Sequence, residues 1–179
     1  MARTTFQGPV RSLGGIFQQG PASVVAITSS TTLNPVDHAG RIISVGGSLA
    51  ANVVLTLPTI DVSTNPVTSG PGQDPSTTNN QGVTYTIWVP TTISTSSLKI
   101  GTDGTDKFVG SVLSIDTDSS GATVGFTAAS TNDYINLNGT TTGGVAGTWI
   151  QIFAIAANKY MVTGVVNGTG TVATPFADS

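Results

Sequence analysis

The chain has 179 residues, no cysteine, a formal net charge of −3 and only 8% charged residues, against roughly 25% in an average soluble domain. This length predicts one domain with room for an appended arm, and the missing cysteines exclude disulfides and thiolate metal sites. Thr, Val, Ser and Gly are abundant and Glu is absent, so the composition favours an all-β fold.

Charge is divided unevenly along the chain. Residues 1–41 carry three Arg and one Asp, a net of +2, whereas residues 42–179 carry three Lys and eight Asp, a net of −5. Nucleic-acid binding needs clustered Lys and Arg, so we expect no nucleic-acid partner. No apolar run approaches the roughly 20 residues that cross a bilayer, and the N-terminus lacks the apolar segment of a secretory signal. We therefore expect no membrane partner.

The first 35 residues differ in composition from the rest. Proline and glycine recur, and only Val24–Thr28 has the pattern of a short strand. A floppy terminus is the simplest interpretation. Several large apolar side chains favour instead an extended N-terminal arm, residues 1–35, that orders against a partner, because linkers seldom carry so many. The residues expected to anchor this arm are Arg3, Phe6, Val10, Arg11, Leu13, Ile16 and Phe17.

The body is expected over residues 36–179. Its first two strands are predicted at 41–45 and 52–57, joined by a turn at Gly46-Gly47. Residues 58–82 then contain four prolines, which exclude a continuous helix or a central strand. A connection of this length predicts a projecting Pro/Gly-rich loop.

Short strands separated by Gly, Asn, Asp and Ser continue to the end of the chain. Alternation of apolar and polar residues predicts them at 83–89, 98–100, 108–115, 124–127 and 134–137, with 170–173 closing the sheet. About ten such strands predict a sandwich or a barrel, and we expect a β-sandwich, jelly-roll-like in form.

The most apolar stretch, residues 148–166, predicts a central hairpin with its turn at Ala157-Asn158. A helix is the alternative for its Ala-rich middle, but aromatic and β-branched residues dominate. Both alternating sets of the first strand are largely apolar, so we expect both of its faces to be covered. The two sets are Trp149, Gln151, Phe153 and Ile155, and Ile150, Ile152 and Ala154.

Candidate catalytic residues are few. His38 is the only histidine and follows Asp37. A Ser-His-Asp triad assembles in space, so spacing alone leaves it open, but residues 37–40 are more typical of a turn entering a strand. With no Glu, no Cys and no prominent Asp pair, the sequence predicts no catalytic residue, no cofactor and no enzyme.

Two further groups admit a ligand-binding interpretation. The densest acidic group could supply oxygen ligands to calcium, but turn formation is the simpler explanation, so we expect no metal site. This group is Asp103, Asp106, Asp116 and Asp118. Trp88 and Trp149 could each stack on a sugar, but their positions in strand patterns favour core packing.

The opening ARTTFQGPVRSLGG and the closing TWIQIFAIAANKYMVTGVVNGTGTVATPFADS resemble virion structural proteins of tailed bacteriophages. So do the internal runs HAGRIISV, VVLTLP, GTDKFVGS and YINLNG. Such proteins are similar to head decoration, or cement, proteins, and related bodies also occur in head fibres and tail appendages. That resemblance implies a β-sandwich body, often trimeric, that clamps neighbouring capsomers on the capsid exterior.

Three functions remain open from the sequence. The leading prediction is a capsid decoration protein of the virion, made in the host cytoplasm, with the major capsid protein as partner. The alternative is a receptor- or glycan-binding module of a head fibre or tail appendage, using the 58–82 loop or Trp88, and a small hydrolase is the third. Few charged residues protect the strand edges, so we also expect a homotrimer.

Overall fold

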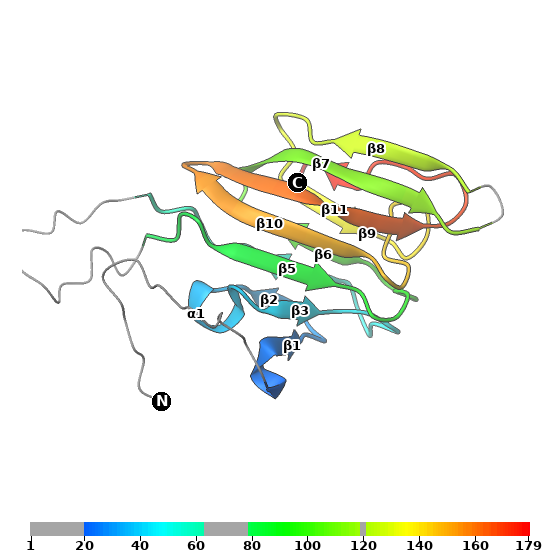
Figure 1. Cartoon of the computed structure of the whole chain (residues 1–179), viewed down its shortest axis with the longest axis horizontal. Coiled ribbons are helices and arrows are strands. Elements are labelled where there is room, and N and C mark those ends of the chain that lie inside the picture. Colours follow the sequence, from blue (N-terminus) through cyan, green and yellow to red (C-terminus); the bar gives the residue numbers. More distant parts are fainter. Residues whose placement is uncertain (1–19, 63–78, 119–120) are drawn as a thin grey trace, which may run out of the picture.

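The computed structural model describes residues 20–62, 79–118 and 121–179. This part of the chain is nearly all β, in two mixed sheets that pack as a sandwich-like body (Figure 1). The all-β prediction is confirmed. No helix in these residues is long and apolar enough to cross a membrane.

The larger sheet has seven strands in the order β1-β3-β5-β10-β11-β7-β8. Its centre is the predicted hairpin, whose turn places Asn158 at φ 60°, a left-handed conformation that Asn tolerates. The strands are β1 (Val24–Ala26), β3 (Ile42–Ser44), β5 (Thr84–Trp88), β7 (Lys107–Asp116), β8 (Thr123–Thr127), β10 (Trp149–Ala156) and β11 (Lys159–Gly168).

The smaller sheet has five strands in the order β12-β9-β6-β4-β2. They are β2 (Thr31–Thr32), β4 (Val53–Thr56), β6 (Leu98–Gly101), β9 (Tyr134–Leu137) and β12 (Phe176–Ala177). A 3-10 turn, η1 (Pro21–Ser23), precedes β1, and one helical turn, α1 (Pro35–His38), lies between β2 and β3.

The first six strands alternate between the two sheets, and their neighbours within each sheet run parallel. β1, β3 and β5 pair in parallel in one sheet, and β2, β4 and β6 do so in the other. Parallel strands need a crossover connection, and here each crossover includes one strand of the opposite sheet. The turn at Gly46-Gly47 therefore joins strands of different sheets. The jelly-roll form, which is built from antiparallel Greek keys, is not confirmed.

One hydrophobic core fills the space between the sheets. Strand alternation explains its composition: in β4, Val53 and Leu55 are buried while Val54 and Thr56 are half-buried on the other side. β6, β9 and β5 contribute their inward residues in the same way. The largest side chains with almost no exposure include Tyr85, Tyr160, Phe108, Leu33, Ile43, Leu55 and Leu57.

The body begins earlier than the sequence predicted. β1 pairs with β3 and β2 pairs with β4, so both lie within the sheets. Ile27 and Leu33 are buried in the core. The boundary at residue 35 is therefore corrected, because hydrogen bonding and apolar burial hold the segment from Val24 onward in the sandwich.

The prediction that both faces of the first hairpin strand are covered is wrong for the described chain. Ile150, Ile152 and Ala154 of β10 are buried against the smaller sheet. Trp149 and Ile155, on the opposite face, are each 39% exposed. An apolar alternation shows which side chains share a face, but only a third layer covers that face, and the described residues supply none.

Candidate functional site

The outer side of the seven-stranded sheet carries exposed apolar side chains in two register rows, with the polar side chains of Thr86, Gln151 and Thr163 in the row between them. We call it the open face: the side chains of these seven strands that point away from the smaller sheet. Seven of the ten exposed large apolar side chains in the described residues lie on it, each 37–44% exposed. They are Val24, Ile42, Trp88, Leu113, Trp149, Ile155 and Met161.

Strand register arranges these side chains in rows across the sheet. Paired residues of neighbouring strands lie side by side on one face, where aromatic and aliphatic side chains contact one another. One row crosses β5, β10, β11 and β7 as Trp88, Trp149, Val165 and Leu113. A second crosses β10, β11 and β7 as Phe153, Met161 and Val109.

The open face carries almost no charge. None of its strand residues is acidic, and its two lysines, Lys107 and Lys159, are register partners at the same end of the sheet. The Lys107 ammonium turns away to pair with Asp133. The prediction that Trp88 and Trp149 are core residues is therefore wrong, because both lie in this exposed, uncharged surface.

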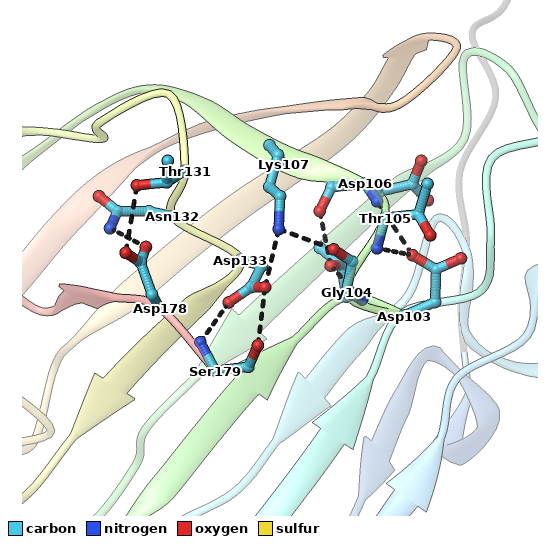
Figure 2. Close-up of polar contacts among 11 residues, drawn as sticks. Asp103, Gly104, Thr105, Asp106, Lys107, Thr131, Asn132, Asp133, Asp178 and Ser179 are labelled. Atoms are coloured by element: carbon cyan, nitrogen blue, oxygen red, sulfur yellow. Dashed lines mark hydrogen bonds and ion pairs between the residues drawn. The ribbon is translucent and has the colours of Figure 1, made fainter.

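A polar network closes one end of the sandwich, where β7 begins and the chain ends (Figure 2). Lys107 Nζ lies 2.9 Å from Asp133 Oδ2 and donates to the carbonyl of Gly104. Asp133 also accepts from the backbone N–H and the hydroxyl of Ser179. Burial raises the pKa of Asp133, but the contacts with Lys107 and Ser179 outweigh it and lower the pKa overall.

Neighbouring polar contacts hold the last residues of the chain in the same network. Asn132 Nδ2 donates to Asp178 Oδ1 at 2.8 Å, and the Thr131 hydroxyl donates to Asp178 Oδ2 at 3.2 Å. Figure 2 shows Asp178 and Ser179 facing the turn before β9. This arrangement fastens β12 to β9 and is typical of a structural contact.

The four aspartates suggested as a calcium site do not come together. Asp103 and Asp106 lie in the turn before β7, whereas Asp116 and Asp118 lie at its far end, ten strand residues away. Asp116 accepts from the backbone N–H of Asp118, as expected of a turn. Within the described residues, no three His, Cys, Asp or Glu side chains gather closely enough to hold a metal ion.

Asp103 and Asp106 have opposite electrostatic environments. Burial raises the pKa of Asp103, but hydrogen bonds from Asp106, Thr59 and Thr105 outweigh it, so the pKa is lowered overall. Asp106 is fully buried, with one bond from the Ile60 N–H and, among the described residues, no hydrogen-bond partner for Oδ1. Burial therefore raises its pKa, despite the Ile60 bond, and the nearby Asp103 charge adds to the effect.

The same interior holds two tyrosines. Burial raises the pKa of Tyr85 to about 12, and its hydroxyl has no hydrogen-bond partner in the described residues. Burial, with smaller effects from Tyr85, Asp106 and Asp103, also raises the pKa of Tyr160, whose hydroxyl donates to the carbonyl of Pro58. This bond ties the central hairpin to the start of the predicted 58–82 loop.

The base of the 58–82 loop is well ordered. Asn80 is buried, accepts from the Asp61 N–H and donates to the Thr59 carbonyl, so it joins the two ends of the loop. Ile60 packs in the core. Residues 63–78, the projecting part of the prediction, lie outside the described residues.

His38 has a structural place in α1. It is 8% exposed, and its Nδ1 accepts from the backbone N–H of Asn34 at 3.0 Å. Asn34 is the helix N-cap and accepts from the Asp37 N–H, while its amide donates to the Asp37 carboxylate. The Asp37-His38 pair thus takes part in capping one helical turn, a detail that the sequence pattern predicted only as a turn.

The outer side of the smaller sheet contains a hollow of about 330 Å³ with both polar and apolar side chains in its lining. Lys99 Nζ lies over the Tyr134 ring, 5.9 Å from its centroid. The Tyr134 ring lies against Gly101, where a Cβ would come within 2.5 Å of it. The hollow is lined by Val54, Lys99, Tyr134, Asn136, Ala177, Asp178 and Ser179. Sequence patterns gave no sign of it, because it joins β4, β6, β9 and the chain end.

The predicted arm anchors, Arg3, Phe6, Val10, Arg11, Leu13, Ile16 and Phe17, all lie outside the described residues. Comparison of the chain with protein-family models, curated proteins and solved structures gave no match.

Proposed function

We propose that this chain is a non-enzymatic decoration protein on the exterior of a phage head, where it binds the major capsid protein and stabilises contacts between capsid subunits. The observation that carries the proposal is the open face, whose exposed apolar side chains suit packing between the copies of an assembled decoration protein, whereas small substrates are bound in concave sites. The sequence runs that resemble virion proteins of tailed bacteriophages are the reason for proposing a phage head as the partner.

In this proposal the N-terminal residues attach the body to the capsid, and the copies form a homotrimer. The segment before Gly20 contains five large apolar side chains and two arginines. Ordering an extended segment costs roughly 1–2 kcal/mol per residue in backbone entropy, so many contacts along its length are required. Three arms on one trimer add avidity without a new type of contact.

The test is attachment of purified protein to phage heads that lack it, measured by co-sedimentation. The informative variant lacks residues 2–19, since the structure places Val24 onward in the sheets. We expect this variant to melt like the full chain and to lose most of its attachment. A full-length variant with Phe6, Leu13 and Phe17 changed to Ser separates apolar anchoring from arm length.

Full attachment by both variants would contradict the arm. Deleting residues 63–78 instead then tests the long loop as the contact. If neither deletion affects attachment, the sandwich itself holds the capsid. If the unmodified protein does not attach to such heads at all, the decoration proposal fails.

A second candidate function is glycan binding, and the hollow beside Tyr134 favours it. An aromatic ring with a few convergent polar groups is a common arrangement in small-ligand sites. Here those groups come from Lys99, Asn136 and Asp178. A sugar that raises the melting temperature of the full chain, but not that of Tyr134→Leu, would support this function. An array of host glycans with no bound member would remove it.

A further inference from the structure

We propose that the open face is the surface through which copies of this chain pack against one another. Its occupant is a second copy of the same sheet. The inference depends on the geometry of that sheet and stands whether or not the chain binds a capsid. From the sequence, association is expected through unprotected strand edges, whereas here it is assigned to the face of the larger sheet.

The size of the open face matches that of a stable interface. Seven strands about 4.8 Å apart make a sheet about 29 Å wide. The eight residues of β10, at about 3.3 Å each, make its centre about 26 Å long. Because the seven strands range from three to ten residues, their 44 residues together cover about 700 Å², of the same order as the roughly 800 Å² that each partner buries in a standard interface.

The composition of the face is that of an interface core. Such cores are enriched in aromatic residues and Met and depleted of Asp, Glu and Lys. Trp88, Trp149, Phe153 and Met161 lie on the central strands, and the two lysines lie together at one end.

The lack of charge favours a second copy as the occupant. A different protein partner is commonly selected by opposite charges across the contact, and this face offers none at its centre. Symmetric copies bring identical groups close to one another near the axis, where like charges would repel. The rows through Trp149 and Phe153 contain no charged residue, so they can meet their own copies at no electrostatic cost.

Sheet packing supplies the geometry. Two sheets pack face to face about 10 Å apart, with side chains filling the space between them. Two copies related by a two-fold axis can meet in this way through the open face. Trp88, Trp149 and Met161 lie on β5, β10 and β11, the three strands at the middle of the sheet.

Tryptophan fluorescence tests this surface directly. Trp88 and Trp149 are the only tryptophans of the chain, and both lie on the open face. Emission and acrylamide quenching of the full chain are recorded from about 10 nM to about 100 μM, a range that brackets micromolar dissociation constants. We expect a blue shift and reduced quenching as concentration rises, in step with an increase in mass by sedimentation velocity.

Matched variants locate the contact. Leu113→Lys places a charge in the tryptophan row without removing either reporter, and we expect it to weaken association by more than about 10-fold. The control is Val36→Lys, the same kind of change at a valine of α1 that is 56% exposed and off the sheet. We expect the control to associate like the unmodified chain.

Three outcomes decide the inference. A monomer with constant tryptophan quenching across the whole range overturns it. An oligomer whose tryptophans stay accessible, or which Leu113→Lys leaves intact, places association on another surface and also overturns it. A dimer with both tryptophans covered supports the surface and replaces the trimer. A chain that stays monomeric but still attaches to phage heads would overturn self-association through the open face and leave the decoration proposal standing.

Discussion

The two outer sides of this sandwich share one core but have opposite surfaces. The five-stranded sheet presents Lys99, Tyr134 and Asn136, and its edge is fastened by the contacts of Asp133 and Asp178. The seven-stranded sheet presents two tryptophans and a methionine, each 37–40% exposed, on either side of the polar Thr86 and Gln151. Both surfaces come from the same alternation of strand residues.

The two sides differ in whether their surface groups have contacts within the chain. At the smaller sheet, Lys99 lies over the Tyr134 ring and Asp133 and Asp178 accept hydrogen bonds, so these groups contribute to folding, whereas the buried Asn136 Oδ1 has no hydrogen-bond partner in the described residues. Apolar groups on the open face have no covering layer in the described residues, so they gain only when another molecule covers them. Changes on the smaller sheet should therefore alter stability, and changes on the open face should alter association.

The largest effect on stability is expected for Lys107→Met, because the Lys107 ammonium, although its strand β7 belongs to the larger sheet, pairs with Asp133 beside β9 of the smaller one. The substitution removes the ion pair with Asp133, and we expect unfolding free energy to fall by about 1–2 kcal/mol at pH 7, less than for a fully buried pair because the lysine is partly exposed. Chemical denaturation measures this. Lys159→Met, at the paired position on β11, is the control and should change stability little.

The same pair predicts a pH dependence. The folded-state pKa of Asp133 is lowered, so its contribution is present above the ordinary value of 3.8 and is lost as the pH falls through the folded value. The difference between the unmodified chain and Lys107→Met should thus shrink in acid. A difference that is unchanged down to about pH 2 would contradict this assignment.

Asp106→Asn is expected to have a smaller effect, of the opposite sign. The folded-state pKa of Asp106 is raised, so its contribution is full below 3.8 and is lost as the pH rises through the folded value. Because an amide carries no charge, Asp106→Asn should be more stable than the unmodified chain at pH 7, by about 1 kcal/mol. That advantage should disappear at low pH.

Asp103→Asn provides the matched comparison, three residues away in the same turn. In the unmodified chain, burial raises the pKa of Asp103, but its three hydrogen bonds outweigh burial and lower that pKa overall. We expect a loss of about 0.5 kcal/mol at pH 7, since solvent screens this exposed group. Thermal melts of both variants from acid to neutral pH should diverge in opposite directions, and parallel curves would show that the two environments are alike.

The smallest stability effect is expected on the open face itself. Leu113→Lys should change the unfolding free energy of the dilute, monomeric chain by no more than about 0.5 kcal/mol, as for an ordinary surface substitution. Denaturation at several protein concentrations measures it. A large loss at every concentration would mean that the open face stabilises the single chain, and the contrast between the two sides would no longer hold.

The sequence alone predicted the strands well, because alternation of apolar residues and turn-forming residues are local properties. The strands over residues 83–89, 108–115 and 134–137 and the hairpin turn at Ala157-Asn158 all appear in the structure. Its preference for turn formation in the four aspartates also agrees with their separation along β7. The arm anchors and the trimer remain predictions.

Only the tertiary structure decided which faces are covered and which distant residues meet. Trp149 and Ile150 are both apolar neighbours in one strand, yet one is 39% exposed and the other fully buried. Lys107 and Asp133 are 26 residues apart, and no local pattern relates them. Alternation assigns a side chain to a face, but burial depends on the second sheet and on the winding of β1 to β6 between the two layers, which are long-range properties of the fold.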